Sequence, residues 1–355
     1  VQATILSGLE TNAVALHYLV MPDRLNILLT SRDEQLSYTI DSWNGEPFSE
    51  ATLNAALADL HLGFNDFFSD PRAESEVLYD LLVGPVEQDL ARIDPELLLL
   101  SQDRRLRYLP YQALYDGAEY LVERYDIASL TSSESEITGV AVAETPFAGL
   151  GLTRAVGDFS ELPGVALEFG GLLSGEERYG FMDGALALDE AFDRAALAEA
   201  LTIGGSSSVG AGTIHVASHF VLGASEDDSY LLLGTGEHLP VSEIKGTAGD
   251  FDFSNVDLLT WSACETGRAN PGSDGREIES LAKITGERGA RATLATLWPV
   301  LDISTPLIMQ RFYELRAFGG LSKAEALATA QREFIQRRIG DRDVLDRESV
   351  VFQTA

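Results

Sequence analysis

The chain has 355 residues, of which 45% are hydrophobic and 8% aromatic, so it is long enough to bury one large core or two modest ones. Acidic residues outnumber basic ones 56 to 25, and the formal charge of −31 argues against direct binding to nucleic acid. A single cysteine forms no intramolecular disulfide, which fits a cytoplasmic location, and no run approaches the roughly 20 apolar residues of a membrane span, so no membrane partner is expected.

The first 135 residues predict a small mixed α/β unit. Apolar and polar residues alternate from 13 to 41, which predicts three antiparallel strands joined by turns. The elements expected next are helices at 53–60 and 75–90 and strands at 96–100 and 125–130. This part holds no cluster of acids, bases or metal ligands with useful spacing, so we expect it to serve as a scaffold.

A polar, unpatterned stretch at 131–136 follows, so we expect two domains, 1–135 and 136–355. In the second domain buried strands alternate with helices, which is the pattern of an α/β fold with a mainly parallel sheet and helices on both faces. The expected strands are 147–152, 213–219, 230–233, 256–264 and 292–299. The expected helices begin near 163, 188, 277, 305 and 322, with Asp189, Thr305 and Ser322 as N-caps.

Two of these strands end on residues that can do chemistry. The run 256–264 delivers the only cysteine, Cys264, to the carboxyl end of a strand, which is where open α/β sheets build their sites. The run 213–219 ends in the same way on His219. An adjacent imidazole activates a thiol by taking its proton or by pairing with the thiolate. We therefore expect His219 and Cys264 to be neighbours and to form a catalytic dyad.

Each of these residues also has a plain structural interpretation. A lone buried cysteine is ordinarily a small apolar core residue, and a histidine at a strand end is ordinarily a hydrogen-bonded structural one. His215, on the same face of its strand as His219, is expected to be packed. The acids at 226–228 could orient the imidazole, but a backbone carbonyl would do so equally well, so no third member is assigned. No pair of histidines has metal-ligand spacing with a second donor, and no metal site is expected.

A set of motifs runs through both halves of the chain. It comprises Tyr79-Asp-Leu-Leu82, Leu109-Pro-Tyr-Gln-Ala-Leu114, His215-Val-Ala-Ser-His219-Phe220, Leu258 to Gly267, Gly289 to Asp302, and Phe312-Tyr313 with the helix from Ser322. Together these motifs resemble the CHAT domain, a family grouped with the caspase-like cysteine peptidases. The resemblance covers nearly the whole chain.

The resemblance implies a caspase-like peptidase part at 136–355, preceded by the smaller mixed α/β unit at 1–135. It implies a cysteine endopeptidase that uses His219 and Cys264 and needs no cofactor. The backbone N–H groups of Phe220 and Cys264 would hold the oxyanion. Many caspase-like enzymes have glycine where this chain has Phe220, but a backbone donor survives any side chain except proline.

The resemblance also implies partners. CHAT domains commonly follow tetratricopeptide repeats, and this chain opens on Val1 and lacks the usual aromatic-rich strand at its end. We therefore expect missing sequence on both sides, with an upstream repeat region or another partner that activates the enzyme. The expected substrate is a protein in a bacterial signalling or defence pathway.

Substrate preference rests on fewer residues. The resemblance implies that the substrate residue before the scissile bond is held near the strand after the cysteine strand, at whose end lie Trp298 and Asp302. Asp302 could accept a lysine or arginine side chain there. Equally, Asp302 could cap the helix that begins near Thr305. Arg268 and Arg276 flank a turn-rich loop and are candidate sites of self-cleavage.

Two other functions stay open. The first is an inactive caspase-like scaffold whose acidic surface binds a basic protein partner. The second is a cysteine hydrolase that acts on substrates other than peptides. The reactivity of the thiol separates enzyme from scaffold, because a buried core thiol is inert.

Overall fold

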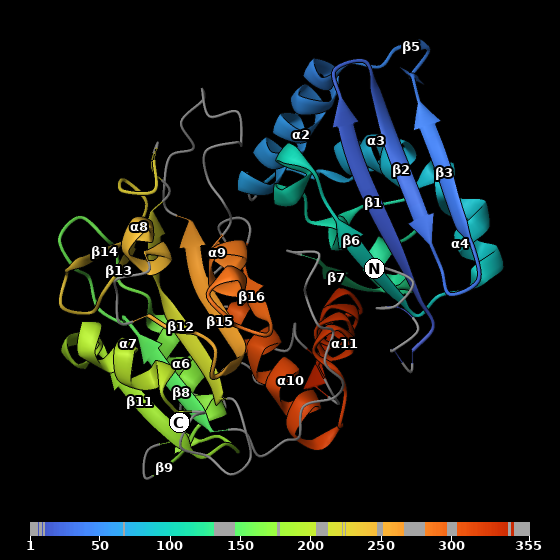
Figure 1. Ribbon diagram of the computed structural model, residues 1–355. Coiled ribbons are helices and arrows are strands. Elements are labelled where there is room, and N and C mark those ends of the chain that lie inside the picture. The colour runs from blue at the N-terminus through green and yellow to red at the C-terminus, as the bar shows by residue number, and fades with distance from the viewer. Residues whose placement is uncertain are drawn as a thin grey trace. The chain divides into compact units, whose positions relative to one another are not determined.

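The computed structural model of the protein is shown in Figure 1. It describes residues 6, 9, 11–66, 68–130, 146–175, 178–203, 212–221, 223, 225–246, 251–265, 281–296, 304–339 and 342–343, with the backbone alone at 65, 263–265, 281–283, 339 and 342–343. The chain divides into two compact units, Val1–Gly139 and Val140–Ala355. The expected boundary at 131–136 lies outside the described residues.

The first unit contains a five-stranded sheet in the order β3-β2-β1-β6-β7. Its strands are β1 (Ala13–Met21), β2 (Arg24–Thr30), β3 (Gln35–Ile40), β6 (Leu97–Ser101) and β7 (Asp126–Ser129). The first three form the predicted antiparallel meander, and β6 and β7 extend it in parallel from β1. A small separate ribbon pairs β4 (Ser42–Trp43) with β5 (Glu46–Pro47).

Helices of the first unit share a core with this sheet. They are α2 (Glu50–Asn65), α3 (Arg72–Leu82), α4 (Glu87–Ile93) and α5 (Leu121–Arg124), with short 3₁₀ turns at Gly84–Val86, Arg104–Tyr108 and Tyr111–Ala113. The single helix predicted at 75–90 is wrong, because Pro85 offers no backbone N–H and divides it into α3 and α4. The buried Tyr18 hydroxyl donates to the carbonyl of Leu82 at 3.1 Å, which joins β1 to α3.

The second unit is built on a mainly parallel sheet, as predicted. Its strands are β8 (Phe147–Gly151), β11 (Gly184–Leu188), β12 (Gly212–Val221), β13 (Tyr230–Leu232), β14 (His238–Pro240), β15 (Val256–Glu265) and β16 (Thr293–Ala295). The parallel strands lie in the order β11-β8-β12-β15-β16, and β13 and β14 form an antiparallel hairpin that joins β12 at Phe220 and Val221. Shorter ribbons pair β9 (Ser174–Gly175) with β10 (Arg178–Tyr179) and β17 (Arg338–Ile339) with β18 (Arg342–Asp343).

Helices cover both faces of this sheet (Figure 1). They are α6 (Pro163–Leu172), α7 (Arg194–Leu201), α8 (Val241–Lys245), α9 (Leu281–Glu287), α10 (Ser304–Phe318) and α11 (Lys323–Ile335). One core cluster joins Ile214 and Val216 of β12 to α7, α8 and α9. A second joins Ala217 of β12 to α6, α10 and α11. Alternate residues of β12 thus face two different helical layers, as the two-residue period of a strand requires.

Three predicted helix starts can be compared with the structure. The capping box at Ser322 is confirmed, because its hydroxyl accepts from the N–H of Glu325. Asp189 as an N-cap is wrong: Asp189 has a left-handed φ of 53° and opens a 3₁₀ turn, and Asp193 caps α7 instead. Thr305 lies inside α10, which begins one residue earlier.

Candidate active site

The strands β12 and β15 bring the predicted dyad residues to one position of the sheet. The parallel register pairs the Cα atoms of His215 with Thr260, of Ala217 with Ser262, and of His219 with Cys264. Neighbouring strands lie about 4.8 Å apart, so this is close to the distance that separates the two backbones. Both residues lie near the carboxyl ends of their strands, although β12 continues two residues beyond His219.

The imidazole of His219 is buried, with 1% of the residue exposed. Its Nε2 lies 2.9 Å from the carbonyl oxygen of Ser160, and the ring of Phe159 lies 5.1 Å away between centroids. Both contacts come from the segment between β8 and α6. A carbonyl oxygen only accepts, so Nε2 carries the donated hydrogen, and in the neutral ring Nδ1 is then the basic atom. This arrangement leaves Nδ1 as the atom that can take up a proton.

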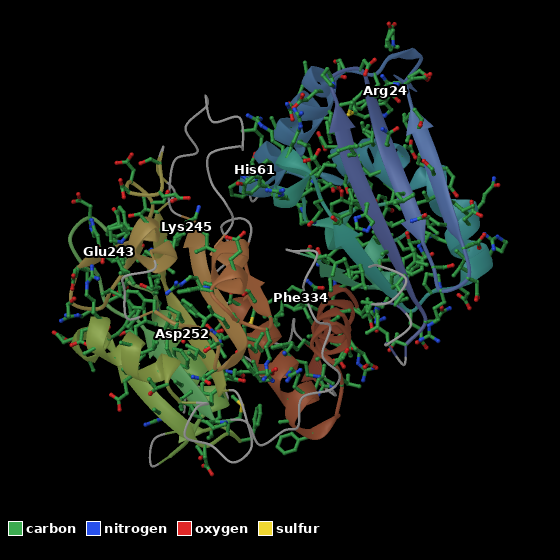
Figure 2. All side chains as sticks on the ribbon, viewed as in Figure 1. Arg24, His61, Glu243, Lys245, Asp252 and Phe334 are labelled. Atoms are coloured by element: carbon green, nitrogen blue, oxygen red, sulfur yellow. The ribbon has the colours of Figure 1, made fainter. Side chains whose placement is uncertain are left out.

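Two of the acids considered as partners for this imidazole have other contacts. Glu226 accepts from the Nζ of Lys245 at 2.7 Å, and Lys245 is the last residue of α8 (Figure 2). Asp228 accepts from the hydroxyl of Ser225 at 2.7 Å. Of the two alternatives left open by the sequence, a backbone carbonyl contacts His219.

The backbone N–H of Phe220 points toward β15, the strand that carries Cys264. Its ring packs in the core cluster shared with α7, α8 and α9, so it lies on the opposite face of the sheet from His219. Backbone N–H groups alternate in direction along a strand: Thr213 donates to the residue before β8, and Gly212 donates to the residue before β15. Phe220 is an even number of residues from Gly212, so its N–H points toward β15 as well. The bulky side chain therefore does not block this N–H.

Other polar side chains lie on the same face of the sheet, nearer the amino ends of β12 and β15 than the two dyad residues. Glu168 of α6 is 2% exposed and places Oε1 3.1 Å from Nε2 of His215, which is completely buried. This contact has the distance of an ion pair without the angles of a hydrogen bond. The hydroxyl of Ser262 donates to the other carboxylate oxygen, Oε2, at 3.4 Å. Carboxylate oxygens of one helix residue thus contact both central strands.

The family of this chain follows from a comparison with family models. The model of the CHAT domain matches residues 72–346, which is more than half of the sequence. The chain belongs to the CHAT domain family. CHAT domains are related to the caspase-like peptidases. A search of curated proteins found no match.

The match begins at the first residue of α3 and spans the whole sheet of the second unit. It therefore includes both strands that carry the predicted dyad of this CHAT domain. Trp298, Asp302, Arg268 and Arg276 also fall within the matched range, but they lie outside the described residues.

The described part of this CHAT domain has neither a metal-binding cluster nor a membrane-spanning helix. Among the residues that the structure describes, no three His, Cys, Asp or Glu side chains are grouped so as to hold a metal ion. Within the same residues, no helix combines the length and hydropathy needed to cross a bilayer.

The contacts of Glu168 were not predicted from the sequence. Glu168 lies in the helix that was expected to begin near 163, and no partner was expected for it. The available signal was a single acid within the otherwise apolar run Pro163–Leu172 of α6. Acidic side chains are almost never fully buried unless they are paired, so a single acid on an apolar helix indicates a buried partner.

Proposed function

We propose that this CHAT domain is a cysteine endopeptidase in which His219 and Cys264 form the catalytic dyad. The observation that carries this proposal is the register that pairs the two residues at one position of β12 and β15. The contact of His219 with the carbonyl of Ser160 supports it, because a fixed tautomer leaves Nδ1 as the base.

The proposed reaction proceeds in two steps. Nδ1 of His219 takes the thiol proton of Cys264, and the thiolate attacks the carbonyl carbon of the scissile peptide bond. The imidazolium then protonates the leaving amine, and a thioester remains on the enzyme. In the second step water, deprotonated by His219, attacks the thioester and restores the thiol. A cysteine alone is only a few per cent thiolate near pH 7, so the imidazole supplies most of the activation.

The oxyanion would be held by the backbone N–H groups of Phe220 and Cys264. Both groups belong to a register that continues through Phe220 and Glu265, so both lie along the ladder between β12 and β15. These N–H groups can donate to an oxyanion only if their hydrogen bonds at the carboxyl end of this ladder break. An upstream repeat region or another activating partner would supply that opening.

Substrate choice is part of the same proposal. Asp302, together with Trp298, would bind a lysine or arginine side chain before the scissile bond, and the formal charge of −31 would attract a basic segment. Arg268 and Arg276 would then be candidate positions for self-cleavage. The expected substrate is a protein in a bacterial signalling or defence pathway, and the reaction needs no cofactor.

A second candidate function is an inactive caspase-like scaffold that binds a basic protein partner. The observation in its favour is the same ladder, because N–H groups that pair within a sheet offer nothing to an oxyanion. The excess of acidic residues would attract the partner.

Cleavage of a diverse peptide library tests the proposal, with the cut sites mapped by mass spectrometry. We expect cuts by the wild type that disappear in Cys264→Ala, and we expect them to cluster after lysine or arginine. The same library with the upstream repeat region added covers the case in which that region activates the enzyme. Absence of cuts in both conditions would favour the scaffold.

A further inference from the structure

We propose that Glu168 is a positioning residue: its buried carboxylate ties β12 to β15 one step below His219 and Cys264. This inference rests on the proposed function, because it concerns how the dyad is held. Glu168 itself touches neither residue of the dyad in the described contacts. Its action would pass through Ser262 and His215, which it does contact.

The two oxygens of this carboxylate contact two different strands. Oε1 faces His215 of β12 at 3.1 Å, and Oε2 accepts from Ser262 of β15 at 3.4 Å. His215 and Ser262 are not opposite each other in the register, since His215 pairs with Thr260. The carboxylate therefore spans the two strands diagonally and resists sliding of one strand along the other.

These contacts lie close to the proposed dyad along both strands. Ser262 precedes Cys264 by two residues, and its register partner, Ala217, precedes His219 by two. Two residues of strand span about 6.6 Å. A shift of β15 relative to β12 at Ser262 would therefore move Cys264 relative to His219.

The helix that carries Glu168 also adjoins the contact that orients His219. The carbonyl of Ser160 lies three residues before the start of α6, and Glu168 lies in the second turn of that helix. One segment of chain thus supplies the acceptor for the imidazole and the clamp between the strands. Movement of α6 would disturb both at once.

Burial makes these contacts costly to lose. Glu168 is 2% exposed and His215 is not exposed, and a carboxylate in such a place is stable only with partners. The rings of Phe169 and Tyr313 lie 5.2 and 5.7 Å from that of His215, so the surroundings of the pair are mostly aromatic. Structural packing alone would not require the carboxylate to reach a second strand through Ser262.

The rate of alkylation of Cys264 by iodoacetamide, measured against pH, tests this inference without any substrate. Cys264 is the only cysteine, so the signal has one source. We expect Glu168→Leu to slow alkylation at neutral pH by about tenfold or more, as a misplaced base does. Glu168→Gln keeps an acceptor for Ser262, and we expect it to slow alkylation by less than about threefold.

Two further variants keep the test decisive. Ser262→Ala removes the contact with a small change in volume, and we expect it to slow alkylation even if Glu168→Leu does not fold. Asp257→Asn removes another buried acid, 3% exposed, near the other end of β15, and we expect it to leave the pH profile unchanged.

The outcomes separate the two proposals. A wild-type thiol that reacts rapidly, together with unchanged rates in folded Glu168→Leu and Ser262→Ala, would overturn the positioning role and leave the dyad standing. A wild-type thiol no faster than glutathione would overturn the dyad, and the positioning role with it.

Discussion

At the scale of single residues, Nε2 of His219 contacts a backbone carbonyl. The carbonyl of Ser160 at 2.9 Å fixes which ring nitrogen carries hydrogen, and Phe159 limits how the ring turns. Every residue has a backbone carbonyl, so a different residue at position 160 would still offer this acceptor to His219. A backbone acceptor is therefore sufficient to orient the base.

A buried pair of hydroxyl groups tests the packing of α10 against β15. Tyr313 of α10 and Thr260 of β15 are hydrogen-bonded through their hydroxyl oxygens at 2.8 Å, and burial raises the pKa of Tyr313 above its usual range. We expect Tyr313→Phe to lower the free energy of unfolding by about 1 kcal/mol, because the hydroxyl of Thr260 stays buried without this partner. Urea unfolding measures the change.

The matched control for this prediction is Tyr179→Phe, since Tyr179 is 56% exposed. Its hydroxyl can exchange a protein contact for water, so we expect a change below about 0.5 kcal/mol. Equal effects at the two positions would mean that the contact between Tyr313 and Thr260 adds no stability.

At the scale of elements, α6 is the helix on which the site depends most. It packs on the same face of the sheet as α10, and it carries Glu168 in its second turn, directly after the segment that contacts His219. Its close approach to β8 relies on glycine. A Cβ built on Gly149 of β8 would lie 2.6 Å from Cε1 of Phe169, which is closer than carbon atoms pack.

We therefore expect Gly149→Ala to destabilise the protein by about 1 to 3 kcal/mol, because Phe169 and Leu186 must move to admit the methyl group. Thermal and urea unfolding measure the effect. Phe169 belongs to α6, so its movement would displace that helix, and we expect this displacement to slow alkylation of Cys264.

Gly170→Ala is the control, on α6 itself. A Cβ there would meet nothing within 4 Å, and alanine favours a helix over glycine by about 1 kcal/mol. We expect this variant to be as stable as the wild type or more so. Destabilisation by both variants to the same extent would contradict the close packing inferred between β8 and α6.

At the scale of the whole molecule, the sequence indicates most of the architecture. Alternation in β1 to β3 and the apolar runs of β12 and β15 are strong signals, because one or both faces of those strands must be buried. The mainly parallel sheet follows from strands that alternate with helices. The family match over 72–346 agrees with the resemblance carried by the motifs.

Other features could not be predicted, for physical reasons. The carbonyl of Ser160 is a backbone atom and leaves no mark in the sequence. The carboxylate of Asp189 accepts from the N–H and the hydroxyl of Thr153, a contact between residues 36 apart in the sequence, and Asp193 caps α7 in its place. The partners of Glu168 lie about 50 and 90 residues away, and helical periodicity identifies the buried face of a helix but not what it meets.

The central claim is that His219 activates Cys264, and the most direct test is the alkylation rate of Cys264 against pH in the wild type and in His219→Ala. We predict that the wild-type thiol reacts near pH 7 much faster than glutathione. We predict that His219→Ala moves the profile toward the ordinary thiol pKa of about 8.5. Identical profiles in the two proteins, or a wild-type thiol as slow as glutathione, would contradict the claim.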